Sequence, residues 1–334
     1  MGAEMRYVII GAGAIGGTLG AHMLRKGHDV LFVDSAADHV AAINERGLTI
    51  EGFNGTFTTP ARAVAPAELR GPLHAVLLAT KAHATEAAVA SFADLLAPDG
   101  FVVSVQNGLN EWTISRIVGR DRTIGCFINF SSDYLEPGRI HFGGPGKFAI
   151  GELDGSITPR LRTLHGAVSA LCPVEMTDNI FGYLWGKLAY GAMLTATALT
   201  NDSMGDGIDR NRELMVHLAA EVLAVADAAG VRPLGFDGFE PDLYRSGDWA
   251  AIDASLDRMV AIRRQDQKAR TGIWRDIAVR KRKTEVHAHY APVVAEAERH
   301  GIPVPRLRTL MRLIAEVETG QRQQSAANLA EIPA

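Results

Sequence analysis

A glycine-rich turn near the amino terminus constrains the fold of this chain more than any other feature. The apolar run RYVII is followed by GAGAIGG, which places Gly11, Gly13 and Gly16 in G-x-G-x-x-G spacing. Gly11 permits a tight turn, Gly13 lets a pyrophosphate approach the backbone, and Gly16 lets a helix pack on a strand. The helix would begin at Ala14 and Ile15, whose backbone N–H groups and positive dipole end suit phosphate. We therefore predict a dinucleotide-binding site in a Rossmann-type domain.

The residue that ends the second strand-like run indicates which dinucleotide binds. Asp34 closes DVLFVD, near the usual offset of about 20 residues beyond the last glycine. Its carboxylate would accept hydrogen bonds from ribose hydroxyls and repel a 2′-phosphate, and the following SAADH has no Arg or Lys to bind that phosphate. FAD would also accept an acidic residue here, but the chain lacks the second nucleotide motif common in flavoenzymes. We predict NAD(H) as the favoured cofactor, with NADP(H) as the alternative.

Alternating strand-like and helix-like segments predict a parallel sheet in the first half of the chain. Runs rich in Val, Ile and Leu, separated by helical patterns, are typical of a sheet that helices cover on both faces. The later strand-like runs are DVLFVD, HAVLLAT, FVVSVQNG and FAIGELDG, and helical patterns cover Ile15–Lys26 and residues 84–97. This half of the chain therefore predicts an α/β domain of Rossmann type over residues 1–173.

From about Val174, glycine becomes rarer and long helical patterns dominate. These patterns cover Tyr183–Leu199, Arg212–Ala229, Ala251–Arg264, Thr284–His300 and residues 307–318. We predict an all-α domain over residues 174–334 that binds the substrate and supports dimerisation.

Composition and charge exclude several other classes of protein. A chain of 334 residues can bury two cores, and a net charge of −4 gives no overall attraction to nucleic acid or to an anionic membrane. Cys126 and Cys172 lack metal-ligand spacing and fit a reducing compartment. The amino-terminal apolar run is too short and too rich in glycine to span a bilayer. We predict a cytoplasmic protein that acts on a small molecule, without a metal site and without a nucleic-acid or membrane partner.

Two polar residues follow neighbouring strand-like runs. Lys81 comes after HAVLLAT, and Asn107 lies at the end of FVVSVQN. Ligands of open α/β sheets bind at the carboxyl ends of the strands, so both residues are candidates for the cofactor site. A solvated lysine and a tight Asn107-Gly108 turn explain the same residues equally well.

Six segments along both halves of the chain together resemble the ketopantoate reductase (2-dehydropantoate 2-reductase) family. They are GAGAIGG, ATKA, VQNGLN, WGKL, RKRKTEVH and HGIPVP, and they occur in the family's order and spacing. The resemblance implies a Rossmann domain followed by an all-helical domain, with the active site in the cleft between them. It also implies hydride transfer from a reduced nicotinamide to the carbonyl of a 2-oxo acid, giving a 2-hydroxy acid.

The resemblance assigns roles to individual residues. Lys187 matches the family's catalytic lysine and Glu285 its acidic partner. Asn107 matches an asparagine beside the nicotinamide, and Lys81 a lysine near the cofactor. The chemistry agrees, because an ammonium can stabilise charge on the carbonyl oxygen and deliver a proton, while a carboxylate orients it. The alternative for Lys187 is a lysine whose aliphatic stem covers apolar neighbours.

The sequence departs from the family where substrate is held. The family's asparagines at i+4 and i+8 from the lysine are replaced by Gly191 and Thr195, on what we expect to be one helical face lining the cleft. The family serine that binds the substrate carboxylate falls at Gly272, beside Thr271. Without these side chains the hydroxyl of ketopantoate would stay unpaired, so we expect the same reaction on another 2-oxo acid that is bulkier or less hydroxylated. Tyr190 either restores some polarity or packs in the core, and packing is favoured.

Three further segments carry weaker expectations. Arg275 is a candidate to bind a substrate carboxylate through its guanidinium, whereas the basic run Arg280–Lys283 is interpreted as a solvated face. The Gly- and Pro-rich segment 233–249 is either a lid or interface element around Asp237 or a surface insertion. The tail 323–334 is expected to be loose.

These observations leave several hypotheses for the function. The leading one is an NAD(H)-preferring 2-oxo acid reductase in which Lys187 is the general acid and Glu285 its partner. A true 2-dehydropantoate 2-reductase that tolerates Gly191 and Thr195 is the first alternative. A 3-hydroxy acid or opine-type dehydrogenase, or a sensor that binds NAD(H) without turnover, are the others. The amphipathic helices and the loop around Asp237 also suit a homodimer.

Overall fold

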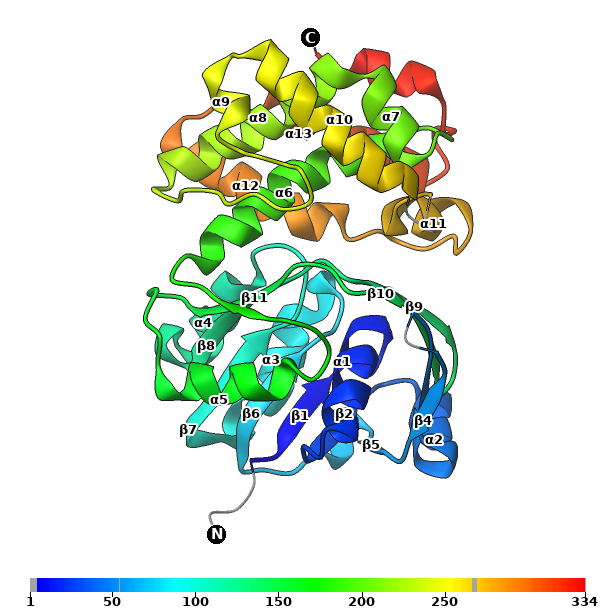
Figure 1. The fold of residues 1–334 in the computed structure, drawn as a ribbon, viewed down its shortest axis with the longest axis vertical. Helices are drawn as coiled ribbons and strands as arrows, with labels where there is room; N and C mark the ends of the chain where they lie inside the picture. The colour runs from blue at the N-terminus through cyan, green and yellow to red at the C-terminus, as the bar shows by residue number, and fades with distance from the viewer. Residues whose placement is uncertain (1–4, 54, 266–268, 334) are drawn as a thin grey trace. The chain divides into compact units, whose positions relative to one another are not determined.

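The computed structural model describes residues 5–53, 55–265 and 269–333. The chain divides into two compact units, Met1–Ile180 and Phe181–Ala334 (Figure 1). The division lies somewhat beyond residue 173, because the short strand β12 (Glu175–Met176) still pairs with the sheet of the first unit.

An eight-stranded sheet forms the centre of the first unit. Its order is β12-β11-β8-β7-β6-β1-β2-β5, and every neighbouring pair is parallel except β8 with β11. The strands are β1 (Tyr7–Ile10), β2 (Val30–Val33), β5 (Arg62–Val64), β6 (Leu73–Leu78), β7 (Leu96–Ser104), β8 (Thr123–Ile128) and β11 (Phe148–Glu152). Strand order reverses at β1, which has β2 on one side and β6 on the other. Such a reversal is where ligands of open α/β sheets bind.

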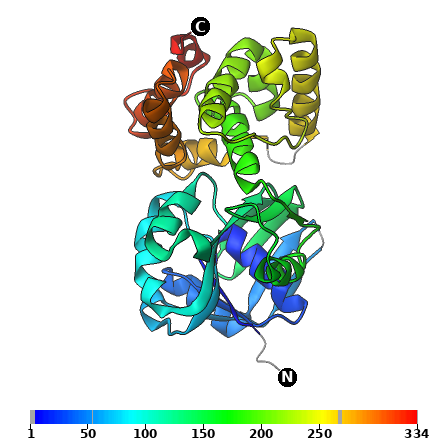
Figure 2. The ribbon, with the colours of Figure 1, turned by 90° about the vertical axis from the view of Figure 1, so that its left-hand side faces the viewer.

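Helices cover both faces of this sheet, as the sequence predicted. Figure 2 shows α1 (Ala14–Arg25) and α5 (Pro159–Val168) on one face, and α3 (Thr85–Phe92) and α4 (Asn110–Val118) on the other. Each face has its own core: Leu19, Met23, Leu161 and Leu164 belong to the first, and Val89, Phe92 and Ile114 to the second. Helix α2 (Ala37–Arg46) follows β2.

A second, four-stranded sheet in this unit was not predicted. Its order is β4-β3-β10-β9, with β3 (Leu48–Gly52), β4 (Phe57–Thr59), β9 (Ser131–Glu136) and β10 (Arg139–Gly144). It packs on α1, where Ser132 Oγ lies 2.9 Å from the Ala14 carbonyl oxygen and 2.8 Å from Thr18 Oγ1. Its strands are difficult to predict because the alternation of apolar positions is short: it covers only LTI in β3 and IHF in β10, and β9 (SSDYLE) is mostly polar.

The second unit is helical. Its helices are α6 (Ile180–Thr197, which begins at the unit boundary), α7 (Met204–Arg210), α8 (Arg212–Ala228), α9 (Leu243–Ser246), α10 (Trp249–Gln265), α11 (Gly272–Ala278), α12 (Val286–His300) and α13 (Pro305–Glu318). The five predicted helices are all present, as α6, α8, α10, α12 and α13. Helix α13 shows why the pattern was readable: its buried residues Leu307, Leu310, Leu313, Ile314 and Val317 follow helical spacing.

The Gly- and Pro-rich segment 233–249 packs within its own unit. Phe236 and Phe239 are buried, and their ring centroids lie 5.3 Å and 5.8 Å from that of Tyr190. The Leu234 N–H also donates to the Gly182 carbonyl of α6, at 2.8 Å. This confirms the packing interpretation of Tyr190 and places the aromatic residues Phe236 and Phe239 of the segment in the core. A homodimer stays a prediction.

The expectation of a loose carboxyl-terminal tail is wrong. The tail forms the short helix η5 (Ala326–Glu331) and buries Leu329 and Ile332. Gln324 Nε2 donates to the Ala198 carbonyl at 2.7 Å, and Asn328 Nδ2 to the Leu199 carbonyl at 3.0 Å. These bonds satisfy carbonyl groups just beyond the end of α6, which a helix cannot satisfy by itself.

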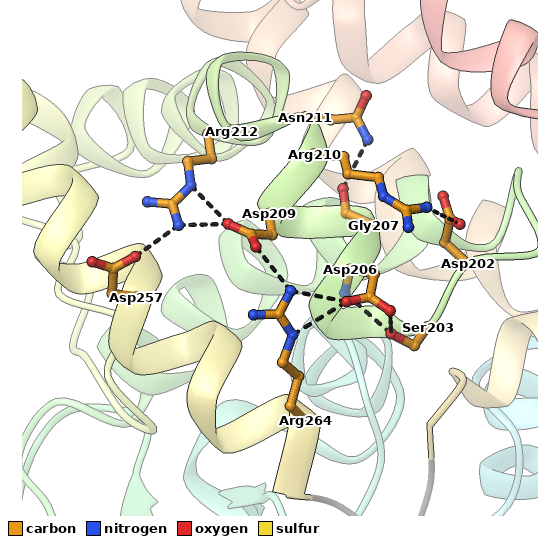
Figure 3. Close-up of polar contacts among 10 residues, drawn as sticks. All are labelled: Asp202, Ser203, Asp206, Gly207, Asp209, Arg210, Asn211, Arg212, Asp257 and Arg264. Carbon is orange, nitrogen blue, oxygen red and sulfur yellow. Dashed lines mark hydrogen bonds and ion pairs between the residues drawn. The ribbon is translucent and has the colours of Figure 1, made fainter.

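Ion pairs connect α7 with α8 and α10 (Figure 3). Arg264 contacts Asp206 at 2.9 Å and Asp209 at 2.8 Å, while Arg212 contacts Asp209 and Asp257. Arg212 and Arg264 hold the pKa of the Asp209 carboxyl below its usual value. A single exposed ion pair contributes only about 0–1 kcal/mol to stability. We therefore infer that this network mainly aligns the three helices and adds little to the stability of the unit.

None of the helices within the described ranges is long and apolar enough to cross a membrane. Across the same residues, no group of three or more His, Cys, Asp or Glu side chains is arranged to hold a metal ion.

Candidate functional site

The glycine-rich turn lies between β1 and α1, at the reversal point of the large sheet. Gly11 has a φ of 97°, and a Cβ there would lie 2.9 Å from backbone atoms of Ala79 and Thr80. A Cβ at Gly16 would lie 2.1 Å from the Gly11 carbonyl oxygen, whereas one at Gly13 would meet no described atom within 4 Å. Packing therefore requires glycine at 11 and 16, while position 13 adjoins open space. A turn that is open at Gly13 fits a dinucleotide whose pyrophosphate approaches the backbone.

The first turn of α1 is available to an anion. Gly13 is the N-cap, Ala14 and Ile15 are half-buried, and among the described residues no side chain caps this end. The first turn also holds no acidic residue. Backbone N–H groups and the helix dipole thus make this end of α1 suitable for phosphate.

Asp34 supports the glycine-rich turn directly. Its Oδ2 accepts a hydrogen bond from the Ala12 N–H at 2.8 Å, and its Oδ1 accepts one from the Ala36 N–H at 2.9 Å. Asp34 is half-buried, and residues 35–38 are exposed. The carboxylate therefore lies beside the turn, and its oxygens have further lone pairs for ribose hydroxyls.

His39 also contacts this turn, which no motif in the sequence indicates. The Gly138 N–H donates to His39 Nδ1 at 3.0 Å, so the ring proton is on Nε2, which donates to the Ala12 carbonyl at 2.9 Å. The His39 ring also lies against Tyr134 of β9, with centroids 5.1 Å apart. His39 of α2, held by Gly138 and Tyr134 of the smaller sheet region, thus fixes the position of Ala12.

Lys81 and Asn107 follow the adjacent parallel strands β6 and β7, and both are exposed. Lys81 is the N-cap of the short helix η2 (Ala82–Ala84), and Asn107 precedes Gly108, whose φ is 99°. The turn interpretation of Asn107-Gly108 therefore describes the local backbone. The role of Lys81 and Asn107 at the cofactor stays a prediction.

A buried amide network joins the segments that follow β6 and β7. Gln106 Nε2 donates to the Thr80 carbonyl at 2.8 Å and to Thr85 Oγ1 at 2.9 Å. Thr85 Oγ1 donates to Asn110 Oδ1 at 3.0 Å, and Asn110 Nδ2 donates to the Asn107 carbonyl at 2.7 Å. The network thus fixes the backbone at Asn107 relative to the residue before Lys81. Sequence reasoning missed it because its members are far apart along the chain.

Glu111 is a buried acid four residues beyond Asn107. It is the second residue of α4 and is fully buried. Burial raises the pKa of its carboxyl to about 8, although backbone N–H groups and the Ser104 hydroxyl oppose the shift. The protonated carboxyl is therefore the form that the folded protein favours near neutral pH.

Glu111 should make folding stability depend on pH. Its carboxyl ionises near pH 4.5 in the unfolded chain and near pH 8 in the folded chain, so the unfolded chain binds fewer protons between these values. The contribution of Glu111 to the free energy of unfolding is fully present below pH 4.5. It decreases as the pH rises from there to about 8, by up to about 1.4 kcal/mol per pH unit. Urea unfolding between about pH 5 and about pH 9 should show that the free energy of unfolding decreases more steeply with pH in the wild type than in Glu111→Gln. Parallel profiles for the two proteins would contradict the assignment.

In the second unit, Lys187 lies on α6, a helix that is otherwise almost entirely buried. Lys187 is half-buried, between the buried residues Gly186 and Leu188. Gly186 leaves room for the Leu234 carbonyl oxygen, 2.1 Å from where its Cβ would lie. The segment 233–249 thus fixes α6 one residue before the lysine.

Glu285 is the N-cap of α12 and is also half-buried. The preceding residue is anchored firmly: both the N–H and Oγ1 of Thr284 donate to Glu318 Oε2, at 2.9 Å and 2.6 Å. Helix α12 packs on α6, since the Tyr290 hydroxyl donates to the Leu188 carbonyl at 3.2 Å. The helices that carry Lys187 and Glu285 are therefore in contact through Tyr290, and the pairing of the two side chains stays a prediction.

The two positions that depart from the family differ in their surroundings. Gly191 is half-buried, and its Cβ would meet the Tyr290 hydroxyl at 3.0 Å. Thr195 is only 1% exposed and forms a hydrogen bond with the Tyr290 hydroxyl. Burial raises the pKa of this phenol, and the bond with Thr195 opposes the rise in part. Leu194, not Thr195, continues the half-buried face of Lys187 and Gly191. Gly191 therefore lies on the same face as Lys187, as expected, whereas Thr195 points into the core.

The segment around α11 is built on a buried carboxylate. Thr271 caps α11, with Oγ1 accepting from the Trp274 N–H at 2.9 Å, and Gly272 is exposed with no described atom within 4 Å of its Cβ position. Asp276 is 5% exposed and pairs with Arg280 and Arg282, each at 2.9 Å. The basic run is thus only partly a solvated face, because two of its members hold Asp276.

Comparison with known proteins covers both units. Residues 7–155 match the family model described as ketopantoate reductase PanE/ApbA, and residues 179–318 match the model of its C-terminal part. A 2-dehydropantoate 2-reductase of Mesorhizobium japonicum is 28% identical over 262 residues, which are 70% of this chain and 79% of the relative.

Solved structures agree in fold. The 2-dehydropantoate 2-reductase of Geobacter metallireducens GS-15 is 28% identical, with a TM-score of 0.79 over 93% of this chain and 99% of that one. A D-mandelate dehydrogenase in a ternary structure with NADH and anilino(oxo)acetate is 19% identical, with a TM-score of 0.82 over 95% and 99%. At that identity the second likeness concerns the fold alone.

Proposed function

This chain belongs to the ketopantoate reductase family of NAD(P)-dependent oxidoreductases that act on CH–OH groups, and within it we propose that the protein reduces a 2-oxo acid other than ketopantoate to the 2-hydroxy acid. The observation that carries the proposal is the composition of the half-buried face of α6. That face keeps Lys187 but has Gly191 and Leu194 beyond it, so it retains a proton donor and offers no amide to a substrate hydroxyl.

Lys187 is the proposed general acid. A bound reduced nicotinamide supplies the hydride, and negative charge then develops on the carbonyl oxygen of the 2-oxo acid. The ammonium of Lys187 stabilises this charge and transfers a proton to the oxygen as the C–H bond forms. Its half-buried position strengthens the interaction, because the effective dielectric is lower than in water.

Glu285 is the proposed partner of Lys187. A carboxylate at the N-cap of α12 is favoured by the helix dipole, and it offsets the cost of keeping an ammonium partly out of water. Thr284, held by Glu318, restricts where the Glu285 backbone lies. Thr271, Gly272 and Arg275 are the proposed contacts for the substrate carboxylate, and Asn107 for the nicotinamide side.

The proposed cofactor is NAD(H), placed on the turn at Gly11, Gly13 and Gly16 with its adenosine ribose at Asp34. We expect Asp34→Asn to lower the ratio of kcat/KM with NADH to that with NADPH by about tenfold, because a neutral amide no longer repels a 2′-phosphate. Both cofactors should bind less tightly, since Asn has one acceptor oxygen for Ala12 and Ala36, but the ratio isolates the charge.

The matched control is Asp99→Asn, which removes an exposed carboxylate elsewhere in the same unit. It should leave the NADH-to-NADPH ratio as in the wild type. A wild type that prefers NADPH, or an unchanged ratio in Asp34→Asn, would overturn the assignment to NAD(H).

The proposed reaction is tested by a matrix of both cofactors against a panel of 2-oxo acids, monitored by oxidation of the reduced nicotinamide. We expect turnover with branched or aromatic 2-oxo acids to exceed turnover with ketopantoate. A preference for ketopantoate, together with growth of a pantothenate auxotroph, would instead identify a true 2-dehydropantoate 2-reductase. Tight NADH binding with no turnover of any acid would identify a sensor.

A further inference from the structure

From Tyr183 onward, the partly exposed residues of α6 form a single stripe. Along Tyr183–Leu199, all of which the structure describes, only Lys187, Gly191 and Leu194 are partly exposed. These positions are spaced by four and three residues, so they lie on one face of the helix, each about one turn from the next. A molecule that meets the ammonium of Lys187 therefore extends over a bare backbone at 191 and an apolar side chain at 194.

Tyr290 lies beneath the bare position. A Cβ at 191 would meet the Tyr290 hydroxyl at 3.0 Å and no other described atom within 4 Å. The hydroxyl also donates to the Leu188 carbonyl at 3.2 Å, and the side chain is 2% exposed. Because the ring is packed and the hydroxyl is tied to α6, it has little freedom to move aside for a larger residue at 191.

The Tyr290 hydroxyl does not itself serve a substrate. Burial raises the pKa of this phenol well above its usual value, so it stays protonated, and its one proton is committed to Leu188. The hydroxyl lies below the surface that Gly191 forms. The face beyond Lys187 thus presents no hydrogen-bonding side chain to a bound acid.

We propose that Tyr290 is a positioning residue for substrate specificity: its hydroxyl keeps position 191 bare, and the resulting face selects 2-oxo acids with an apolar tail. Specificity would then reside in the pair Gly191 and Tyr290, and not in Gly191 alone. This requires the proposed role of Lys187, which places the reacting carbonyl at one end of the stripe.

Two matched substrates test the proposal. Trimethylpyruvate and ketopantoate differ by one hydroxyl, so the ratio of their kcat/KM values reports how the site treats that group. The wild type should prefer trimethylpyruvate by about tenfold, because the added hydroxyl of ketopantoate would lose its hydrogen bonds to water without replacement.

Three variants separate the contributions of the two residues. Gly191→Asn should lower kcat/KM for both acids, since the new side chain collides with the Tyr290 hydroxyl. Tyr290→Phe alone should leave the ratio of the two acids unchanged. The double variant Gly191→Asn/Tyr290→Phe has room for the amide, so its ratio should shift towards ketopantoate by about tenfold, mainly through KM. Tyr244→Phe, which removes another buried hydroxyl of this unit, should not rescue Gly191→Asn.

Thermal unfolding gives a readout that does not need turnover. Gly191→Ala should raise Tm more in the Tyr290→Phe background than in the wild type, because alanine favours a helix but meets the hydroxyl only when it is present. Equal shifts in the two backgrounds would overturn the proposed contact.

The activity outcomes distinguish two failures. A wild type that turns over trimethylpyruvate, with a double variant whose ratio is unchanged, overturns the role of Tyr290 and leaves the proposed function standing. The same holds if Gly191→Asn alone shifts the ratio as far as the double variant does. If no 2-oxo acid supports oxidation of NADH by the wild type, the proposed function is overturned, and the role of Tyr290 with it.

Discussion

Replacing Lys187 with alanine is expected to lower kcat by about 10²–10⁴ with every 2-oxo acid that the wild type reduces. The variant loses both the charge that stabilises the developing alkoxide and the proton that completes the product. Binding of NADH should persist, because the residues proposed to hold the cofactor belong to the first unit. Steady-state kinetics and NADH fluorescence measure the two quantities separately.

Two comparisons make the Lys187 result specific. Lys187→Arg keeps a positive charge but not an acid of suitable pKa, so it should recover little activity. Lys283→Ala removes an exposed lysine of the same unit and should leave kcat unchanged. Turnover by Lys187→Ala at the rate of the wild type would show that another group delivers the proton.

Gly16→Ala is expected to destabilise the first unit and to abolish tight NADH binding. The new methyl group would lie 2.1 Å from the Gly11 carbonyl oxygen and 2.9 Å from both Ala79 Cβ and Ile9 Cγ2, so α1 must move away from β1. Overpacking of this kind typically costs about 1–3 kcal/mol. Thermal unfolding should therefore show a lower Tm, and titration with NADH a higher Kd.

Gly13→Ala is the informative partner of that variant. Its methyl group meets no described atom within 4 Å, and its φ of −68° suits alanine, so Tm should stay near the wild-type value. The Kd for NADH should nevertheless rise about tenfold or more, because the methyl group occupies the space that a pyrophosphate would use. Gly166→Ala, on the exposed side of α5, should affect neither binding nor folding adversely. If Gly13→Ala bound NADH as tightly as the wild type, the assignment of the pyrophosphate site to this turn would be wrong.

The parts of the fold that the sequence predicted correctly have local signals. The turn at Gly11–Gly16 needs glycine for steric reasons that involve only neighbouring elements, and helices such as α13 repeat their buried positions at helical spacing. The second sheet had only a weak signal, since β3 and β10 alternate apolar and polar residues over three positions and β9 (SSDYLE) combines polar and charged residues. The order of the tail could not be predicted because its few apolar residues are sufficient once Gln324 and Asn328 bond to the carbonyl groups just beyond the end of α6.

The candidate site divides in the same way. Asp34, Lys187 and Glu285 could be proposed because position relative to a motif suggests their chemistry, and their roles stay predictions. His39, Gln106 and Tyr290 were not identified, because each acts through a partner distant in sequence: Ala12, Thr80 and Gly191. Thr195 shows the opposite error, since a spacing of eight residues from Lys187 rotates a helical position far enough to bury it.

The anchoring of the tail on α6 has a consequence for how the protein is made. The carbonyl groups of Ala198 and Leu199 receive their hydrogen bonds from Gln324, Ser325 and Asn328, which the ribosome adds more than a hundred residues later. During synthesis the first unit can fold while the helix that carries Lys187 still lacks the partners of its carboxyl-terminal end. A nascent chain would therefore complete its nucleotide-binding unit early, and would complete the support of the helix that carries its proposed proton donor only once residues 324–328 have been made.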